Sequence, residues 1–359
     1  MPHGKLTQSS PLRVGLAVSL SGSLAPMGID ARRGLELWAD DARRSGTPIE
    51  LVVRDDRSDP LTAGECVTDL LAHQRIDLLA GPYSSGLTRA VAPIAEARGV
   101  VLWNHGGAAD DIHQRGFQSL VSILAPASGY FIPALGWVRT GSVLVLRRAS
   151  SPFSVAITAG AEAEARRQGR PTEVTSYPRT PAAVGALLDR LGSSPPDLLL
   201  AAGRLADDIA LARALRDRGL AIPTALVATP VRAFRHALGP AADGFTGPSQ
   251  WEPTARVAPD VGPPPGVFAG RFARRFGVQP DYPAAQAYAA GLVMSRCVEM
   301  ATAIDQQALR AAAAALDCTT LLGRFRIDPL TGAQIGHTVR LITWVRGERR
   351  LIRLPPSPG

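Results

Sequence analysis

Cysteine is scarce in this chain of 359 residues, which has only Cys66, Cys297 and Cys318. The number is odd and there is no CxxC or His/Cys pairing, which argues against a structural zinc site or a disulfide framework. Cys66 and Cys297 fall in helical patterns, where we expect small buried apolar side chains. A Cys297–Cys318 disulfide stays open, with no spacing that supports it. The sequence therefore predicts no metal and no cofactor.

Lysine is scarcer still, because Lys5 is the only one and arginine supplies nearly all of the formal net charge of +8. Many arginines come in pairs beside Ala, Glu or Asp, as in Arg32-Arg33, and they form no block of five or six. Nucleic-acid binding would require a basic stripe, a known module or aromatic platforms, and none is visible. The positive charge is typical of solvated helix faces, so we expect no nucleic-acid partner.

Long hydrophobic runs are also lacking, and none approaches the length needed to span a membrane. Residues 1–11 are polar and contain no apolar core of a signal peptide. This N-terminus is compatible with two cellular locations of the protein. The protein is periplasmic or on the cell surface if a leader is missing from this sequence, and cytoplasmic if the start is genuine.

The sequence does contain a regular alternation of short aliphatic runs and amphipathic stretches, with 35 glycines and 30 prolines spread along it. Strands are predicted at 12–18, 49–54, 76–80, 100–103, 141–146, 172–176, 197–201, 224–227, 323–327 and 338–346. Helices are predicted at 27–44, 61–73, 88–98, 154–169, 180–191, 206–218, 266–276, 283–304 and 306–316. This order is typical of α/β folds, in which parallel strands are joined by right-handed helical crossovers.

The alternation breaks near 120–130 and then restarts, which predicts two α/β lobes of similar plan. A proline-rich loop at 257–265 precedes further helices, and two strand-like pieces close the chain. We expect both lobes to be discontinuous. The N-terminal lobe is predicted to contain 11–124 and 255–325, the C-terminal lobe 125–254 and 326–354, and flexible ends 1–10 and 355–359.

The turn at 81–88 carries the strongest functional signal. It follows a short apolar run that reads as a buried parallel strand, and it leads into a helical pattern. Ser84, Ser85 and Thr88 fall where that helix begins. Hydroxyl groups and free amide N–H groups at a helix N-terminus favour an anionic group such as a carboxylate. An ordinary helix cap is the alternative interpretation.

A second turn, 104–109, follows the apolar run that ends at Trp103. Its glycines, Gly106 and Gly107, leave backbone groups open to a ligand. If the two preceding strands are neighbours, both turns lie at the carboxyl edge of one sheet, where α/β proteins bind ligands. Trp103 is a candidate for stacking on a ligand, with a place in the core as the alternative.

Taken in order, these segments resemble the type I periplasmic binding-protein fold, in its leucine/isoleucine/valine-binding branch. The resemblance runs from about 12 to about 352. It rests on segments 14–16, 20–22, 54–56, 59–60, 79–85, 104–108, 288–290 and 323–328. The fold implied has two doubly wound, parallel-sheet (Rossmann-like) lobes joined by a three-strand hinge, with a cleft that closes on its ligand.

The resemblance also implies ligand-binding positions. Ser85 matches a serine that holds a ligand carboxylate in the family. The other candidate ligand-binding residues are expected to lie around Ser85 in the cleft. The candidate ligand-binding residues are Met27, Tyr83, Ser84, Ser85, Trp103, Gly106, Gly107, Ala108, Phe153 and Arg204.

The chain departs from the family pattern at several of these positions. Ala108 stands where amino-acid binders carry threonine, and the segment 228–230 has no match for the glutamate that meets a ligand ammonium group. Ser58 and Ser84 stand where the family has disulfide cysteines. The turn at 81–85 also resembles amide- and urea-binding relatives. The ligand is therefore expected to be a small polar carboxylate or amide rather than a conventionally held amino acid.

Three functions remain to be compared. The first is the solute-binding component of an ABC importer, which would dock on a membrane permease and act as a monomer or weak dimer. The second is a cytoplasmic ligand-sensing regulator of the same fold. The third is an enzyme that uses His105, His113, Asp110 and Asp111, which we do not expect, because no catalytic motif is present.

Overall fold

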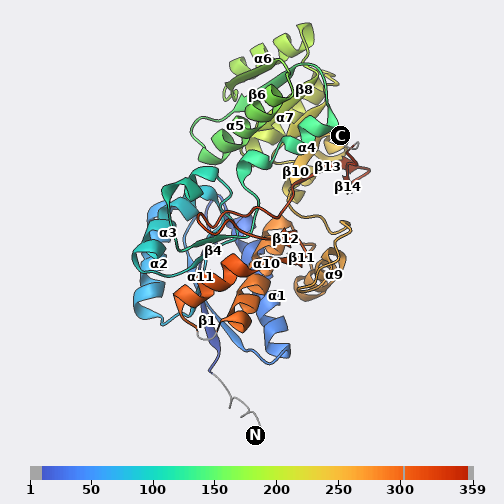
Figure 1. The fold of residues 1–359 in the computed structure, drawn as a ribbon. Helices are drawn as coiled ribbons and strands as arrows, with labels where there is room; N and C mark the ends of the chain where they lie inside the picture. The colour runs from blue at the N-terminus through green and yellow to red at the C-terminus, as the bar shows by residue number, and fades with distance from the viewer. Residues whose placement is uncertain (1–9, 302–303, 355–359) are drawn as a thin grey trace.

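The structure is a computed structural model that describes residues 10–301 and 304–354. It contains two α/β lobes that lie one above the other in Figure 1. The first lobe, at the bottom, holds the blue N-terminal strands together with the orange helices from late in the sequence. The second lobe, at the top, holds the green and yellow segments and the last strands of the chain.

The first lobe is built on a five-stranded parallel sheet with the order β2-β1-β3-β4-β5. Its strands are β1 (Leu12–Val18), β2 (Ile49–Asp55), β3 (Leu78–Ala80), β4 (Leu102–Asn104) and β5 (Leu120–Ser122). One face is covered by α2 (Pro60–His73) and α3 (Ser85–Ala97), and the other by α1 (Ala25–Arg44) and α10 (Tyr282–Met300). Because both faces are covered, the central strands are mostly apolar, apart from Arg13 of β1 and Asn104 at the end of β4.

Three further elements complete the first lobe on the α10 side. They are α9 (Pro265–Phe276), α11 (Gln306–Ala315) and a small antiparallel pair, β11 (Cys318–Thr320) with β12 (Gly323–Phe325). Residues 12–122 and 265–325 therefore share one core although more than a hundred residues separate them. The sequence predicted this discontinuity.

The second lobe has a seven-stranded sheet with the order β14-β13-β10-β9-β8-β6-β7. Its strands are β6 (Val143–Arg147), β7 (Thr172–Ser176), β8 (Leu198–Ala202), β9 (Thr224–Leu226), β10 (Thr246–Ser249), β13 (Arg340–Val345) and β14 (Glu348–Leu351). One face is covered by α4 (Ile132–Trp137) and α5 (Pro152–Arg167), and the other by α6 (Pro181–Ser193), α7 (Leu205–Asp217) and α8 (Arg232–Leu238). Strand β13 pairs antiparallel with both β10 and β14, so this sheet is mixed rather than fully parallel.

The chain passes between the lobes three times, after β5, after β10 and before β13. These crossing segments are bonded to one another. The Gln250 side chain accepts the Ala125 amide N–H over 2.7 Å, and the Gln334 side-chain amide donates to the Ile123 carbonyl over 3.2 Å. The predicted two-lobed α/β fold is thus confirmed, and its lobes meet at a bonded three-segment hinge.

Several predicted boundaries differ from the structure. The helix predicted to begin at Thr88 begins at Ser85, and the helix predicted to end at 304 ends at Met300. Strands β5, β10 and β14 were not predicted, because they are short or contain residues such as the Pro248 of β10 that break a strand pattern. The predicted flexible ends lie outside the described residues except for Ser10, and the residue boundaries of the lobes stay a prediction.

Candidate functional site

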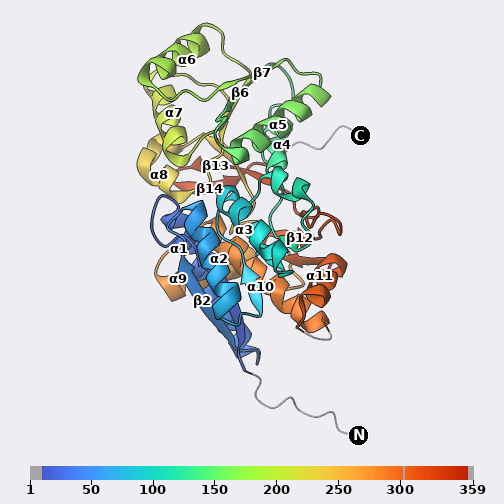
Figure 2. The same cartoon turned by 90° about the vertical axis from the view of Figure 1, so that its left-hand side faces the viewer.

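The two turns singled out in the sequence lie side by side at the carboxyl edge of the first sheet. Strand β3 pairs in parallel with β4, with Ala80 opposite Trp103. The Gly81 amide continues this pairing by donating to the Trp103 carbonyl over 2.9 Å. The expected adjacency is therefore confirmed, and α3, which follows the first turn, lies on the side of the first lobe next to the second lobe (Figure 2).

Ser84 and Ser85 form the N-terminus of α3. Ser84 is the N-cap residue, and its hydroxyl accepts the Leu87 amide N–H over 3.4 Å. The Ser85 hydroxyl is buried and accepts two amide N–H groups, from Ala108 at 3.1 Å and Ala109 at 3.0 Å. Among the described hydrogen bonds, none uses the Ser85 hydroxyl proton or the Ser85 and Gly86 amides. These donors face no protein acceptor and suit a carboxylate.

The Gly106 and Gly107 amides, expected to be free donors, are already bonded, and this expectation is corrected. Both donate to the Asn104 side-chain oxygen, at 3.3 and 2.8 Å. The glycines instead permit close packing. A Cβ at Gly106 would lie 2.5 Å from the Pro82 oxygen, and one at Gly107 would lie 2.4 Å from the Thr88 hydroxyl. Asn104 was not identified as a site residue, because its role depends on the folded loop.

Trp103 does not line the site, which corrects the sequence prediction. Its side chain is fully buried in the core between the first sheet and α10, with no exposed surface. Large aromatic side chains contribute much core area, and this was the alternative interpretation. Ala108 is also buried, and it packs with Leu124 of the crossing segment after β5 and with Tyr130 of the second lobe. It therefore lies where the two lobes meet.

Tyrosine and phenylalanine side chains gather on the facing sides of the lobes. The hydroxyls of Tyr83 and Tyr282 are hydrogen-bonded to each other in the first lobe. In the second lobe Tyr130 packs edge-on against Phe153, with ring centroids 5.4 Å apart. Burial raises the pKa of Tyr83 to about 12. Burial also raises the pKa of Tyr130, with a smaller contribution from the nearby Tyr83 hydroxyl. Sequence analysis identified Tyr83 and Phe153 but missed the other two.

Met27 and Arg204 flank this region less directly. Met27 is half-buried in the first turn of α1. Arg204 is exposed at the N-cap of α7, and its guanidinium group has no carboxylate partner among the described residues. No contact ties either side chain to the tyrosines, so their part in binding stays a prediction.

A buried carboxyl group in the second lobe holds two loops that face the first lobe. Asp208 accepts the Gly203 amide N–H at 3.1 Å, the Ala228 amide N–H at 2.9 Å and the Tyr177 hydroxyl at 2.8 Å. Burial raises the pKa of Asp208 to about 7. Asp208 thus joins the ends of β8 and β9 in one unit. Nothing in the sequence distinguished it from a solvated helix carboxylate.

Ion pairs join the lobes beside the tyrosines. Arg232 of α8 lies 3.2 Å from Asp281 and 3.6 Å from Asp30, both in the first lobe. Arg349 of β14 lies 3.3 Å from Asp281 and 3.3 Å from Glu252 of the hinge. Burial raises the pKa of Asp30 to about 6, with repulsion from Asp281 as the next cause. These pairs were not predicted, because their members are far apart in the sequence.

The side chains considered for acid–base catalysis have structural partners. His113 lies in a short 3-10 helix, η1 (Asp110–Arg115), and its ring contacts the Thr331 carbonyl at 3.1 Å and the Ser122 hydroxyl at 3.0 Å. Asp110 accepts from Ser128, and Asp111 pairs with Arg89.

The remaining sequence candidates for catalysis or metal binding are likewise buried or bonded within the fold. His105 is fully buried, and burial lowers its pKa to about 4. Asp55 and Asp56 accept hydrogen bonds within their turn. Within residues 10–301 and 304–354, no cluster of potential metal ligands is present.

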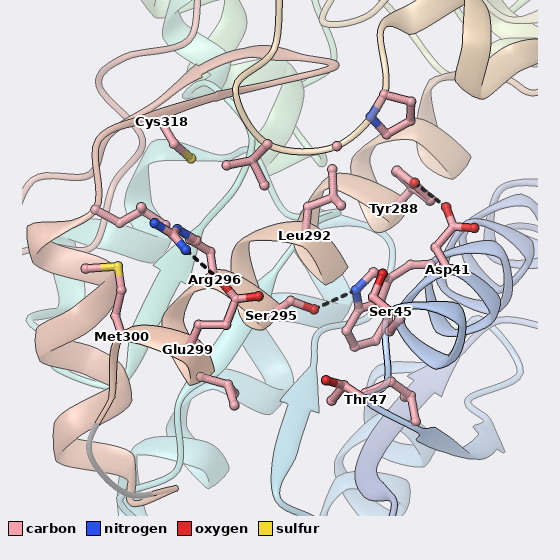
Figure 3. Close-up of a pocket in the computed structure, with 18 of the residues that line it drawn as sticks. Asp41, Ser45, Thr47, Tyr288, Leu292, Ser295, Arg296, Glu299, Met300 and Cys318 are labelled. Carbon is pink, nitrogen blue, oxygen red and sulfur yellow. Dashed lines mark hydrogen bonds and ion pairs between the residues drawn. The ribbon is translucent and has the colours of Figure 1, made fainter. Parts of the chain in front are cut away.

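A large cavity of about 1090 Å³ lies elsewhere in the first lobe, between α1, α10 and β11 (Figure 3). Several of its polar side chains are paired with one another. Tyr288 donates to Asp41 at 2.6 Å, and the Trp38 indole donates to Ser295 at 3.0 Å. Arg296 pairs with Glu299 at 2.7 Å. With these groups satisfied, this cavity has less to offer a polar ligand than the N-terminus of α3.

Comparisons with known proteins agree with this architecture. A sequence profile of the family described as periplasmic binding protein matches residues 11–349. The chain is 28% identical over 120 residues to Leu/Ile/Val-binding protein homolog 7 of Brucella abortus. That match covers 33% of this chain and 30% of the relative, so the chain matches less than a third of the relative's length.

Solved structures resemble the whole chain. A leucine-binding protein of Thermotoga maritima has a TM-score of 0.83 at 17% identity, over 95% of this chain and 98% of that one. A solute-binding protein of an R. palustris ABC transporter, in complex with benzoate, has a TM-score of 0.77 at 22% identity, over 96% of both chains. At these identities the likeness concerns the fold.

The fold and the facing loops define a two-lobed α/β binding protein. Because the family profile spans nearly the whole sequence, the chain belongs to the periplasmic binding protein family. The neighbouring structures described above are binding proteins rather than enzymes. None of the helices in the described part of the chain is long and apolar enough to cross a membrane.

Proposed function

We propose that this protein is the solute-binding component of an ABC importer and that it captures a small carboxylate with an apolar or aromatic body between its lobes. The observation that carries the proposal is the N-terminus of α3. The Ser85 oxygen accepts two amide N–H groups, so the hydroxyl proton is left to donate outward. The Ser85 and Gly86 amides and the helix dipole add to this attraction for an anion.

The tyrosines and Phe153 support an apolar body for the solute. Tyr83 and Tyr282 line the first-lobe side, and Tyr130 and Phe153 line the second. Aromatic rings bury large apolar areas and keep a polar edge for orientation. The benzoate bound to the R. palustris neighbour agrees with a ligand of this shape.

In the described part of the second lobe, the segment 228–230 carries no carboxylate for an α-ammonium group. Thr229 lies in the segment that corresponds to the ammonium-binding glutamate of the family, and its hydroxyl is buried without a hydrogen-bond partner. Asp30 and Asp281 are paired with Arg232. We therefore expect a carboxylate without an α-ammonium group to bind more tightly than leucine or isoleucine.

Binding would act through the lobes rather than through catalysis. A solute that contacts both lobes has a higher affinity for the closed arrangement and shifts the population toward it. The closed form would then dock on the permease, with the periplasm or cell surface as the place of action. The transporter proteins among the neighbours favour this role over a ligand-sensing regulator.

The test is a thermal-shift screen followed by calorimetry with benzoate, hydroxybenzoates, leucine, isoleucine, acetamide and urea. A bound solute stabilises the protein by mass action. We expect saturable stabilisation by an aromatic carboxylate and at least tenfold weaker binding of leucine. Binding of leucine at equal or higher affinity would contradict the proposed solute class, and failure of the whole panel would contradict the solute-binding role.

A further inference from the structure

A cavity of about 240 Å³ is lined by several cationic side chains, including the arginines of the interlobe ion pairs. It is here called the lateral cavity. It lies on the side of the molecule that carries β14 and α9 in Figure 1. Its lining is Arg232, Arg235, His236, Trp251, Pro253, Gln279, Pro280, Trp344, Gly347 and Arg349. The lining includes none of the residues considered for the solute site.

The arginines of the lateral cavity differ in their partners. Arg232 and Arg349 are neutralised by Asp30, Asp281 and Glu252. Arg235 has no carboxylate partner among the described residues, and its Nη1 atom is buried without a hydrogen bond. A buried guanidinium N–H without an acceptor is unfavourable, so an acceptor at this place would stabilise the fold.

A second donor without a partner lines the same cavity. Trp251 lies in the hinge with no exposed surface, and its indole N–H has no hydrogen-bond partner. The ring is held by Phe268, with centroids 5.6 Å apart in an edge-on arrangement, and by the Arg349 guanidinium 6.0 Å from the ring centroid. Its N–H is therefore a fixed donor, unlike a solvated side chain.

We propose that the lateral cavity binds a small oxyanion, such as phosphate, sulfate or a simple carboxylate. Arg235 supplies a positive charge with no carboxylate paired to it among the described residues, and its planar N–H groups match the oxygens of such an anion. The Trp251 indole donates a neutral hydrogen bond to the same anion. The volume suits a small anion and is too small for a nucleotide-sized ligand.

The position of this cavity couples the anion to the lobes. Arg235 belongs to the second lobe, Trp251 to the hinge, and Gln279 and Pro280 to the first lobe. A change in lobe arrangement therefore changes the cavity, so anion affinity and lobe arrangement are linked reciprocally. This proposal concerns a site separate from the α3 N-terminus and holds whatever the transported solute is.

The experiment measures anion binding to the full chain without solute. Sodium sulfate, sodium phosphate and sodium acetate are titrated at constant ionic strength against sodium chloride, with thermal unfolding and calorimetry as readouts. Arg235→Gln removes the charge, and Trp251→Phe removes the N–H while keeping most of the ring. Arg218→Gln is the matched control, because it removes an exposed arginine paired with Asp189 at 3.0 Å.

We expect at least one oxyanion to bind saturably to the wild type and to the Arg218→Gln variant. Affinity should fall at least tenfold in Arg235→Gln and at least threefold in Trp251→Phe, with circular dichroism in chloride confirming that both variants fold. Equal oxyanion affinity in the wild type and Arg235→Gln would overturn the proposal, as would no oxyanion response beyond that to chloride. Unchanged affinity in Trp251→Phe would remove the indole from the site.

Discussion

The Ser85 hydroxyl oxygen lies 3.1 Å from the Ala108 amide nitrogen and accepts its hydrogen bond. This bond joins the N-terminus of α3 to the loop after β4, so the two turns behave as one unit. The same oxygen also accepts the Ala109 amide. Ser85 is therefore both a candidate ligand donor and a structural acceptor within the first lobe.

Replacement of this serine by alanine is expected to weaken both solute binding and folding. Ser85→Ala removes the donor proposed for the solute carboxylate, with an expected loss of affinity of at least tenfold, about 1.4 kcal/mol. It also leaves the buried Ala108 and Ala109 amides without an acceptor, at about 1–3 kcal/mol of stability. Calorimetry with the solute from the screen and urea unfolding measure the two effects.

Ser84→Ala provides the control for Ser85→Ala, because the Ser84 hydroxyl accepts one long bond of 3.4 Å. Its loss of affinity and stability should be smaller than that of Ser85→Ala. Equal effects of the two substitutions would show that Ser85 has no special role.

The backbone at Ser84 carries strain that glycine would relieve. Ser84 has φ 129° and ψ 155°, a region that essentially only glycine populates. Such strain amounts to about 1–3 kcal/mol, whereas replacing a serine N-cap by glycine costs a few tenths of a kcal/mol. Ser84→Gly is therefore expected to raise the free energy of unfolding by about 1 kcal/mol, as measured by urea denaturation. If Ser84→Gly lost as much stability as Ser84→Ala, the backbone at Ser84 would not be strained.

Gly106 is expected to tolerate no side chain. Its Cβ would lie 2.5 Å from both the Pro82 oxygen and the Tyr83 Cα, which are backbone atoms that cannot rotate away. Gly106→Ala should destabilise the protein by about 1–3 kcal/mol through overpacking and displace the Tyr83 turn. Gly185→Ala is the control, because it lies inside α6 with no atom within 4 Å of the added Cβ. It should instead stabilise by about 0.5–1 kcal/mol.

The overall fold was predictable because its signals are local and repeated. The aliphatic runs that became β1, β6 and β8 are bounded by turn residues, and each is followed by an amphipathic helix. The adjacency of the turns after β3 and β4 followed from this alternation, since parallel strands end at one edge. Ser84 and Ser85 were identified for the same reason.

The remaining site features depend on contacts between distant segments. Arg232 and Asp281 lie 49 positions apart, and each reads in the sequence as an ordinary charged residue. Trp103 illustrates the opposite case, since an indole after a strand is compatible with either a core or a ligand site. The structure places it in the core because α10, from late in the chain, covers that face.

The buried carboxyl group of Asp208 should make stability depend on pH. Its pKa is about 7 in the folded protein against an ordinary 3.8, so the folded state holds the proton more tightly. This contribution is fully present below about pH 4 and is lost as the pH rises through about 7. Asp208→Asn removes the titration, so its deficit against the wild type should be larger at pH 5 than at pH 8.

Urea unfolding of the wild type and Asp208→Asn at several pH values measures this difference. Asp189→Asn is the control, because that carboxylate is 69% exposed and pairs with Arg218 at the surface. Its difference from the wild type shows the effect of removing an exposed carboxylate under the same conditions. A constant deficit for Asp208→Asn would mean that the folded protein does not raise this pKa.

The last prediction concerns the ion pairs that join the lobes. Arg232 of the second lobe faces Asp281 and Asp30 of the first, so Arg232→Gln leaves two buried carboxylates with less positive charge. Their burial, no longer offset by Arg232, should favour separation of the lobes, because separation hydrates both groups. We expect a larger radius of gyration without solute and a solute affinity lower by about tenfold, or about 1.4 kcal/mol. Small-angle scattering and calorimetry measure the two quantities. Arg218→Gln, which removes an exposed arginine within the second lobe, should change neither. If Arg232→Gln also left both unchanged, the ion pairs would have no part in closure, and the bonded hinge alone would set the lobe arrangement.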